Sequence, residues 1–432
     1  MSSGMPPSAN PFDAPDAATN PFEGAAPVDA AFAAAGGAVA SPVAAAPAGG
    51  DSGAGGSAWS AKTAALLDGG AQDGERDTYG FEQESDVKAA QDAYLAAGGG
   101  AAAEKQKEKF AKAFSPHKIT VGEGKTVGKQ DRKLKKLLRG GIPKEQRGAV
   151  WMNLAQAVAT TPRDDAYMEQ LWAKAGEGSV VTKDTKQLDL DIDRTFPGHP
   201  LFDSGLGGDE GMAKLRKVLV CYSVHYPYIG YVQGMGFIVG FLLLFMEEQD
   251  AFWMLTWLIE DILPPQYFAP SMVGLNTDLE VLADCVAWKI PKLGALMEST
   301  GVVPQLYATK WLLCIYCDAF PTEVTLRVWD SLFAEGTKVL FRVGVALFRI
   351  HKVELLACDN MMDMLQILKE GARMQIDPDE LLRVAFDDMR YGKFSSKKVE
   401  EFRSAHRPEL EKQWADQEAR RAARDAARVE EQ

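Results

Sequence analysis

The chain is 432 residues long, 46% of its residues are hydrophobic, and its formal net charge is -13. This length suffices for two or three domains of ordinary size, each with its own core. The acidic balance argues against a dedicated nucleic-acid binder, and the longest apolar run, Phe237 to Met246, is about half of a membrane span.

Residues 1–100 are rich in alanine, glycine, proline and serine and show no periodic apolar face. A segment of this composition has little to bury, so we predict a disordered arm. The arm has 13 acidic against 3 basic side chains, whereas residues 101–150 have 5 against 14. Residues 101–134 are predicted to form a basic helix and connector. Interspersed glutamates favour a solvated helix over a surface for acidic lipid or phosphate.

Residues 135–402 show repeated helical patterns. In "MAKLRKVLVCYSV" (212–224), apolar residues recur at three- and four-residue spacing, and Pro227 follows, which predicts a helix and its end. The same pattern occurs in residues 251–263, 279–290, 305–320, 323–336 and 339–356. No alternating strand or Asn-Gly hairpin is present, so the expected fold class is all-α.

The tail, residues 403–432, is polar on nearly every face. Its oppositely charged residues at i,i+4 spacing are compatible with a charged helix, and a frayed segment is the alternative. We predict no function for it.

The five cysteines lie in apolar helical contexts and are predicted to be buried free thiols in a reducing compartment. Cys314 and Cys317 form a C-x-x-C, but no second pair or nearby histidine completes a zinc site. The five histidines are scattered. No metal site is therefore expected, and the start "MSSGMPPSAN" has neither the basic nor the apolar region of a signal peptide.

Four sequence blocks occur together in a recognisable order. They are "LRGGIPKEQRGAVW" (138–151), "LDLDIDRTFP" (188–197), "GYVQGM" (230–235) and "FPTEVTLRVWDSLFAEG" (320–336). In this order and spacing they resemble the TBC domain, the catalytic module of most Rab GTPase-activating proteins. The resemblance covers about 135–400 and implies a TBC-type helical domain over 135–402.

The first family fingerprint, I-x-x-D-x-x-R, is matched with Leu188 in the isoleucine position, Asp191 as the aspartate and Arg194 as the arginine. The resemblance implies that Arg194 is a catalytic arginine finger, which supplies positive charge to a GTPase transition state. An arginine after "DID" would otherwise be read as a partner of Asp191 or Asp193. The four blocks together favour the catalytic interpretation.

The second fingerprint, Y-x-Q-G, is matched by Tyr231, Gln233 and Gly234. The resemblance implies that Gln233 orients the attacking water in place of the GTPase's own glutamine. A lone glutamine in this context would otherwise be read as capping or bridging a helix N-terminus. Gly236 stands where the family commonly has asparagine, and we expect the missing side chain to loosen the hold on Gln233.

Other residues of the four blocks are predicted to support the two fingers rather than to contact nucleotide. These supporting residues are Asp191, Thr195, Tyr231, Gly234, Arg147, Trp151, Trp329 and Asp330.

The resemblance implies an activator that supplies catalytic residues in trans to a Rab-type small GTPase and does not itself hydrolyse GTP. It needs no cofactor of its own, because GTP and Mg²⁺ belong to the substrate GTPase. The alternative is a catalytically silent TBC scaffold that binds a GTPase or an adaptor; intact Arg194 and Gln233 argue against it, and Gly236 keeps it open. A helical solenoid adaptor would need an internal repeat, and none is found.

The arm contains Asn-Pro-Phe twice, as Asn10, Pro11 and Phe12 and as Asn20, Pro21 and Phe22, each followed at once by an acidic residue. The Asn-Pro turn projects the phenylalanine as an anchor. The motif resembles the NPF ligand of EH domains, which are modules of endocytic and recycling adaptors. We therefore expect a cytoplasmic protein that EH-domain partners recruit to endosomal or other vesicle membranes, with peripheral and indirect membrane association and no nucleic-acid partner.

Overall fold

The computed structural model describes residues 59, 61–63, 65, 76–113, 132–175 and 183–430. All of them belong to the structural unit Ala54–Gln432, and the other unit, Met1–Gly53, lies outside the described residues. Regular structure in the described residues is helical, apart from an isolated antiparallel bridge between Arg76 and Glu82. The all-α prediction is confirmed.

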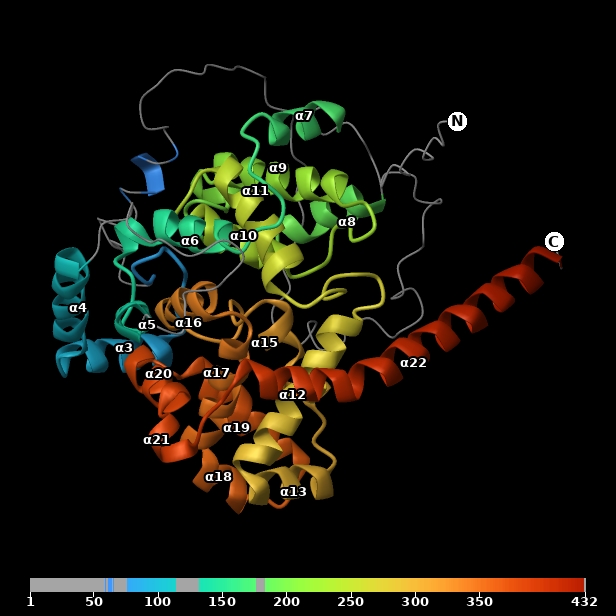
Figure 1. The fold of residues 1–432 in the computed structure, drawn as a ribbon. Coiled ribbons are helices and arrows are strands. Elements are labelled where there is room, and N and C mark those ends of the chain that lie inside the picture. The colour runs from blue at the N-terminus through green and yellow to red at the C-terminus, as the bar shows by residue number, and fades with distance from the viewer. Residues whose placement is uncertain are drawn as a thin grey trace, which may run out of the picture. The chain divides into compact units, whose positions relative to one another are not determined.

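One group of helices contains both sequence fingerprints (Figure 1). Its elements are η2 (Lys144–Gln146), α6 (Arg147–Gln156), α7 (Tyr167–Lys174), α8 (Lys183–Ile192), η3 (Ser204–Leu206), α9 (Asp209–His225), α10 (Met235–Leu243), α11 (Glu248–Trp257) and η4 (Leu258–Ile262). Helix α10 is apolar on every side, all of its residues except Phe237 are buried, and it packs against α9 and α11. It is the central helix of this group, because a helix without a polar face must be enclosed.

The second group follows in the chain. Its helices are α12 (Val273–Lys289), α13 (Pro291–Thr300), α14 (Pro304–Tyr307), α15 (Thr309–Leu313), α16 (Thr322–Glu335), α17 (Lys338–Ile350), α18 (Lys352–Ala357), α19 (Met361–Arg373), α20 (Pro378–Phe386), α21 (Asp388–Tyr391) and α22 (Ser396–Glu430). Every residue of α16 except Glu323 is buried. Since α16 packs against α6 of the first group and α17 of the second, it joins the two groups.

The N-terminal boundary differs from the sequence prediction. Residues 76–100, assigned to the disordered arm, contain α3 (Ser85–Ala96), the start of α4 (Gly99–Ala113) and a buried Tyr79. Trp59 is also buried, and its indole nitrogen donates to the Leu243 carbonyl at 3.2 Å. Single aromatic residues in such a sequence produce no periodic pattern, so the composition of this stretch gives no sign that it packs against the domain.

The basic segment is helical where it is described. Helix α4 buries Phe110 fully, and the side-chain amide of Gln106 donates to the Leu137 carbonyl of α5 (Arg132–Arg139) at 2.8 Å. The basic helix therefore packs onto the domain through one face, while its lysines remain outside. Residues 114–131 lie outside the described residues.

The segment 305–320, predicted as one helix, is broken into α14, α15 and a tight turn. Ile315 and Tyr316 adopt left-handed backbone angles, with φ of 50° and 68°. Three tertiary hydrogen bonds hold the turn: the Trp329 indole donates to the Ile315 carbonyl at 2.9 Å, the Tyr316 hydroxyl to Leu340 O at 2.9 Å, and the Thr325 hydroxyl to Tyr316 O at 3.1 Å. Long-range bonds of this kind override the local helical preference.

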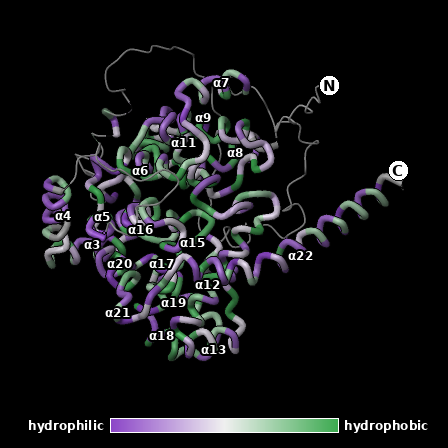
Figure 2. Tube along the Cα trace, viewed as in Figure 1, coloured by the Kyte–Doolittle hydropathy of each residue, from purple (hydrophilic) through white to green (hydrophobic). Residues whose placement is uncertain are grey.

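The tail continues α22, so the charged-helix alternative describes it, and the predicted boundary at residue 402 falls inside a helix. The first turns of α22 pack on α12, where Arg403 pairs with the buried Asp278 at 2.7 Å and His406 with Asp284 at 2.8 Å. Farther along, hydrophilic residues alternate with short hydrophobic ones, mostly alanine (Figure 2). Over the described part of the chain, no helix is both long and apolar enough to cross a membrane.

The cysteines are free thiols. Cys221, Cys285, Cys314 and Cys317 are buried as predicted, whereas Cys358 is only partly buried. Burial raises the pKa of the Cys314 thiol to about 12. The C-x-x-C pair is thus a pair of protonated core side chains.

Candidate functional site

Arg194 lies in a turn directly after α8. The chain reverses through hydrogen bonds from Arg194 N to Asp191 O at 3.2 Å and from Thr195 N to Ile192 O at 3.0 Å, and the Thr195 hydroxyl also donates to Asp191 O at 2.7 Å. The side chain of Arg194 is 53% exposed. We call residues 193–203 the arginine loop. Near its start, Arg194 and Thr195 are bonded to the end of α8, and about half of the Arg194 side chain is open to solvent.

Asp191 is the shared acceptor of the site. Its carboxylate is buried and accepts hydrogen bonds from Arg194, from the Gln187 amide at 3.1 Å and from the Tyr231 hydroxyl at 3.1 Å. Burial and the neighbouring Asp191 charge raise the pKa of Tyr231, so its hydroxyl stays protonated and acts as the donor. Asp191 therefore links the end of α8 to the second fingerprint.

Gln233 lies in the connection between α9 and α10, residues 226–234, which we call the glutamine loop. Its side chain is exposed, and no other described residue forms a hydrogen bond with it. The neighbouring Gly234 has a φ of +105° and precedes the first residue of α10. A left-handed backbone favours glycine, and an added Cβ would lie 3.3 Å from Leu313 and Cys314. Gly234 thus allows the sharp turn that leaves Gln233 outside the core.

Gly236, in the first turn of α10, brings this helix into contact with the arginine loop. A Cβ added at Gly236 would lie 3.1 Å from the Thr195 hydroxyl oxygen and 3.3 Å from its methyl carbon. The first turn of α10 therefore rests directly on the arginine loop, and the absence of a side chain permits the close approach. A looser hold on Gln233 at this position stays a prediction. The Thr195 side chain borders the place where a side chain at 236 would begin.

Arg147, Trp151 and Asp330 form a separate buried cluster between α6 and α16. The Arg147 guanidinium lies 3.4 Å from Asp330 and 2.9 Å from Glu323, and the Trp151 indole donates to Asp330 at 2.9 Å. Burial opposes the charge on Arg147, but the carboxylates of Asp330 and Glu323 outweigh that cost and raise its pKa. The cluster is a structural joint, and none of its polar contacts reaches Arg194 or Gln233.

An aromatic chain connects this joint to the arginine loop. Phe196, two residues after Arg194, packs 6.2 Å from the Phe241 ring on α10; Phe241 packs 5.8 Å from Trp329, and Trp329 packs 5.6 Å from Trp151. Trp329 is fully buried at the centre of this chain. It contributes to the site through packing.

The predicted residues thus occupy two places. Asp191, Thr195, Tyr231 and Gly234 lie at the two loops, whereas the α6–α16 cluster and Trp329 lie behind them. Sequence reasoning missed Gln187, one turn before Asp191 on α8, and Phe196. The i,i+4 spacing of Gln187 and Asp191 is a signal that could have identified the first. No group of three or more metal-ligating side chains occurs within the described residues.

The two Asn-Pro-Phe motifs, residues 10–12 and 20–22, lie outside the described residues.

The comparisons with known proteins match the region that contains the two loops. A family model described as the Rab-GTPase-TBC domain matches residues 144–356. Growth hormone-regulated TBC protein 1 of Xenopus tropicalis is 39% identical over 246 residues, which are 56% of this chain and 69% of that protein. The protein of the same name from Homo sapiens is 38% identical over 243 residues, 56% of this chain and 70% of that protein.

A solved structure has the same arrangement of helices. The crystal structure of the Chlamydomonas flagellar RabGAP TBC domain superposes with a TM-score of 0.59 at 29% identity, covering 72% of this chain and 99% of that chain. The superposition confirms the all-α architecture.

Proposed function

The chain belongs to the Rab-GTPase-TBC domain family, and from this premise we propose that it accelerates GTP hydrolysis by a Rab-type small GTPase through Arg194 and Gln233. One observation carries the proposal: the hydrogen bond between Tyr231 and Asp191 ties the glutamine loop to the end of α8, where the arginine loop begins, and Arg194 and Gln233 are both left exposed. Exposed polar side chains on a fixed backbone are what a partner protein can engage.

Arg194 is proposed to stabilise the transition state. Phosphoryl transfer spreads negative charge over the moving group, and an arginine supplied in trans accelerates it by roughly 10³ to 10⁵. Asp191 also accepts from Gln187 and Tyr231, so it keeps two donors when Arg194 leaves it for a phosphate oxygen. Release of the Arg194 guanidinium therefore does not leave the buried Asp191 carboxylate without hydrogen-bond donors.

Gln233 is proposed to orient the attacking water. Its amide offers a donor and an acceptor on one short arm without a competing charge. No other described residue forms a hydrogen bond with the Gln233 amide, so its donor and its acceptor are both available to the GTPase. This is the role that the GTPase's own switch glutamine would otherwise have.

The test of Arg194 measures phosphate release from a panel of GTP-loaded Rabs with the full chain. We expect stimulation of at least one Rab, and loss of nearly all of it in Arg194→Lys, because an ammonium cannot bridge phosphate oxygens as the planar guanidinium does. Arg216→Lys is the matched control, since Arg216 pairs with Asp189 of α8 at 2.7 Å but lies outside both loops. Wild-type turnover by a folded Arg194→Lys chain would refute the assignment. Rab binding without stimulation would support the silent-scaffold alternative.

The test of Gln233 uses Gln233→Ala and a Rab whose switch glutamine is replaced by leucine. The alanine variant should lose about 10²-fold in activity, as expected for a water-positioning group. The wild-type chain should still stimulate the substituted Rab appreciably. Complete dependence on the Rab's own glutamine would show that Gln233 has a different role.

The arm is proposed to recruit the protein to endocytic or recycling membranes through EH-domain partners, with Phe12 and Phe22 as anchors. This proposal rests on the repeated Asn-Pro-Phe-acidic sequence alone. Each copy should bind weakly, in the range of roughly 10 μM to 1 mM, since a short motif buries little area and must lose chain entropy. Titration of peptide 1–40 against EH domains, with Phe12→Ala combined with Phe22→Ala as control, tests it. Equal binding by the wild-type peptide and the doubly substituted peptide would contradict the proposal.

A further inference from the structure

Residues 76–86, which we call the N-terminal segment, precede the family match at 144–356 and form a tight turn of their own. The Asp77 carboxylate accepts from Tyr79 N at 2.9 Å and from Phe81 N at 3.0 Å, and Asp77 N donates to Phe81 O at 2.8 Å. The flanking residues Arg76 and Glu82 form the isolated bridge. The turn is therefore held by its own polar groups.

This segment lies against the arginine loop. Arg76 donates through Nε to the Gly198 carbonyl at 3.0 Å. Gly198 has a φ of +75°, and a Cβ added there would collide with the Glu82 carboxylate. His199 accepts from Leu201 N through Nδ1, so its Nε2 carries the proton and donates to the Tyr79 carbonyl at 2.9 Å. Two consecutive loop residues thus bond to backbone or side chains of the segment.

The Phe81 ring fills the space behind the loop. Its centroid lies 5.3 Å from Phe196, 4.5 Å from His199 and 5.2 Å from Phe241 on α10. Phe196 is two residues from Arg194. Removal of the Phe81 ring would leave Phe196 without one of the aromatic surfaces that fix it.

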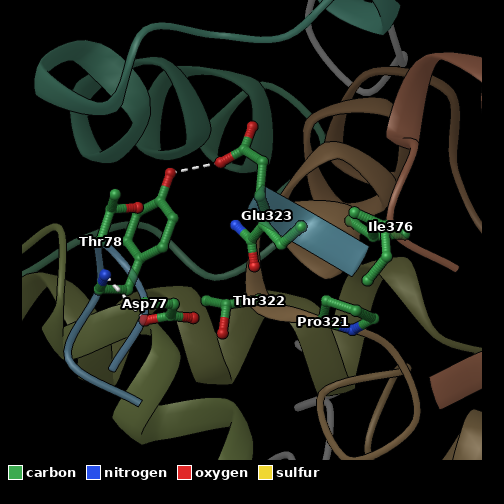
Figure 3. A pocket seen from close by; sticks show the side chains of 9 residues that line it. Asp77, Thr78, Pro321, Thr322, Glu323 and Ile376 are labelled. Carbon is green, nitrogen blue, oxygen red and sulfur yellow. Dashed lines mark hydrogen bonds between the residues drawn. The ribbon is translucent and has the colours of Figure 1, made fainter. Parts of the chain in front are cut away.

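The segment is itself fixed to the body of the domain. The Tyr79 hydroxyl donates to Glu323 and accepts from Arg147 at 2.7 Å, so it belongs to the α6–α16 cluster. At the other end, Arg373 of α19 donates to Glu84 at 2.7 Å and to Asp86 at 2.8 Å. Between the segment and the start of α16, Asp77, Thr322 and Glu323 line a pocket of only about 20 Å³ (Figure 3). The N-terminal segment therefore packs closely against the start of α16.

We infer that the N-terminal segment is a positioning element for Arg194, acting through Phe196, Gly198 and His199. The inference rests on the proposed function of Arg194. The loop forms no regular helix between Ile192 and Ser204, and its turns are closed by its own bonds, such as that from Gly198 N to the Asp203 carboxylate at 2.7 Å. Contacts from outside the loop fix where these turns lie on the domain. The segment supplies such contacts, and Phe81 and Arg76 are positioning residues.

The experiment uses the full chain with Phe81→Ala, Phe81→Leu and Arg76→Ala. Phe394→Ala is the matched control, because Phe394 is buried against Trp288 and not against the loop. In Rab turnover we expect about a 10-fold fall in kcat for Phe81→Ala and Arg76→Ala with KM within about two-fold, as for a misplaced transition-state group. Phe81→Leu should recover much of the loss, and Phe394→Ala should keep wild-type kcat.

A second readout needs no GTPase. Amide hydrogen exchange of peptides spanning residues 193–203 should accelerate in Phe81→Ala and Arg76→Ala and remain as in wild type in Phe394→Ala. Unchanged exchange in a folded Phe81→Ala or Arg76→Ala chain would overturn the inference, as would full kcat in both variants. A wild-type chain that stimulates no Rab would instead refute the proposed function, and the exchange result would still decide whether the segment fixes the loop.

Discussion

His199 gives a quantitative test of how tightly the arginine loop is held. Burial lowers the pKa of His199 from its ordinary 6.5 to about 4, because the ring is 1% exposed. In the unfolded chain the His199 imidazole takes up a proton near pH 6.5, whereas in the folded chain it does so only near pH 4. Protonation of His199 therefore does not reduce the stability of the folded chain above pH 6.5, and it reduces this stability progressively as the pH falls from 6.5 toward 4.

The magnitude follows from the two pKa values. At pH 5 the difference corresponds to about 2 kcal/mol of unfolding free energy, and at pH 7 it is below about 0.3 kcal/mol. Urea unfolding at pH 7 and pH 5 should show the wild-type chain losing about 2 kcal/mol more than His199→Gln, which cannot be protonated. All other titrating groups are common to both chains, so the difference isolates His199.

Parallel losses in the two chains, within about 0.5 kcal/mol at unchanged m-values, would refute the reasoning. They would mean that the ring is hydrated in solution, and that the contact between His199 and Tyr79 is not the closed one seen in the structure.

Two further predictions concern the site and the core. A double-mutant cycle of Tyr231→Phe and Asp191→Asn, measured by urea unfolding, should give a coupling of about 1.5–3 kcal/mol, the range for a hydrogen bond to a charged group. Additive losses would show that the glutamine loop is not bonded to α8 in solution. Cys358 should react with iodoacetamide in the native chain while Cys221 reacts only on unfolding, because burial raises the Cys221 pKa to about 12. Mass spectrometry of peptides resolves the two, and early labelling of Cys221 would contradict its burial.

Several helices were predicted correctly from a periodic apolar stripe followed by a proline or a glycine. Helix α9 before Pro227 and α16 before Gly336 are examples. The prediction failed at 305–320, where the stripe continues but Ile315 and Tyr316 turn left-handed. The bonds that decide this turn come from α16 and α17, and no local pattern contains them.

At the candidate site, family motifs singled out Arg194 and Gln233, but they could not show what surrounds these residues. The motif alone could not show whether Gln233 is exposed, and the structure places it outside the core, directly before Gly234. Phe81 and His199 were missed because their role depends on a contact between segments more than one hundred residues apart. Composition even assigned Phe81 to the disordered arm.

The contact between Gly236 and Thr195 ties the choice of residue at one position to the choice at the other. A side chain added at 236 would place its Cβ 3.1 Å from the Thr195 hydroxyl oxygen and 3.3 Å from the Thr195 methyl carbon, so Thr195 would have to move by a few tenths of an ångström. That movement would act on the bond from the Thr195 hydroxyl to Asp191 O, which ties the residue after Arg194 to the end of α8. The residue chosen at 236 therefore adjusts the position of the chain beside Arg194, although position 236 itself lies on another helix.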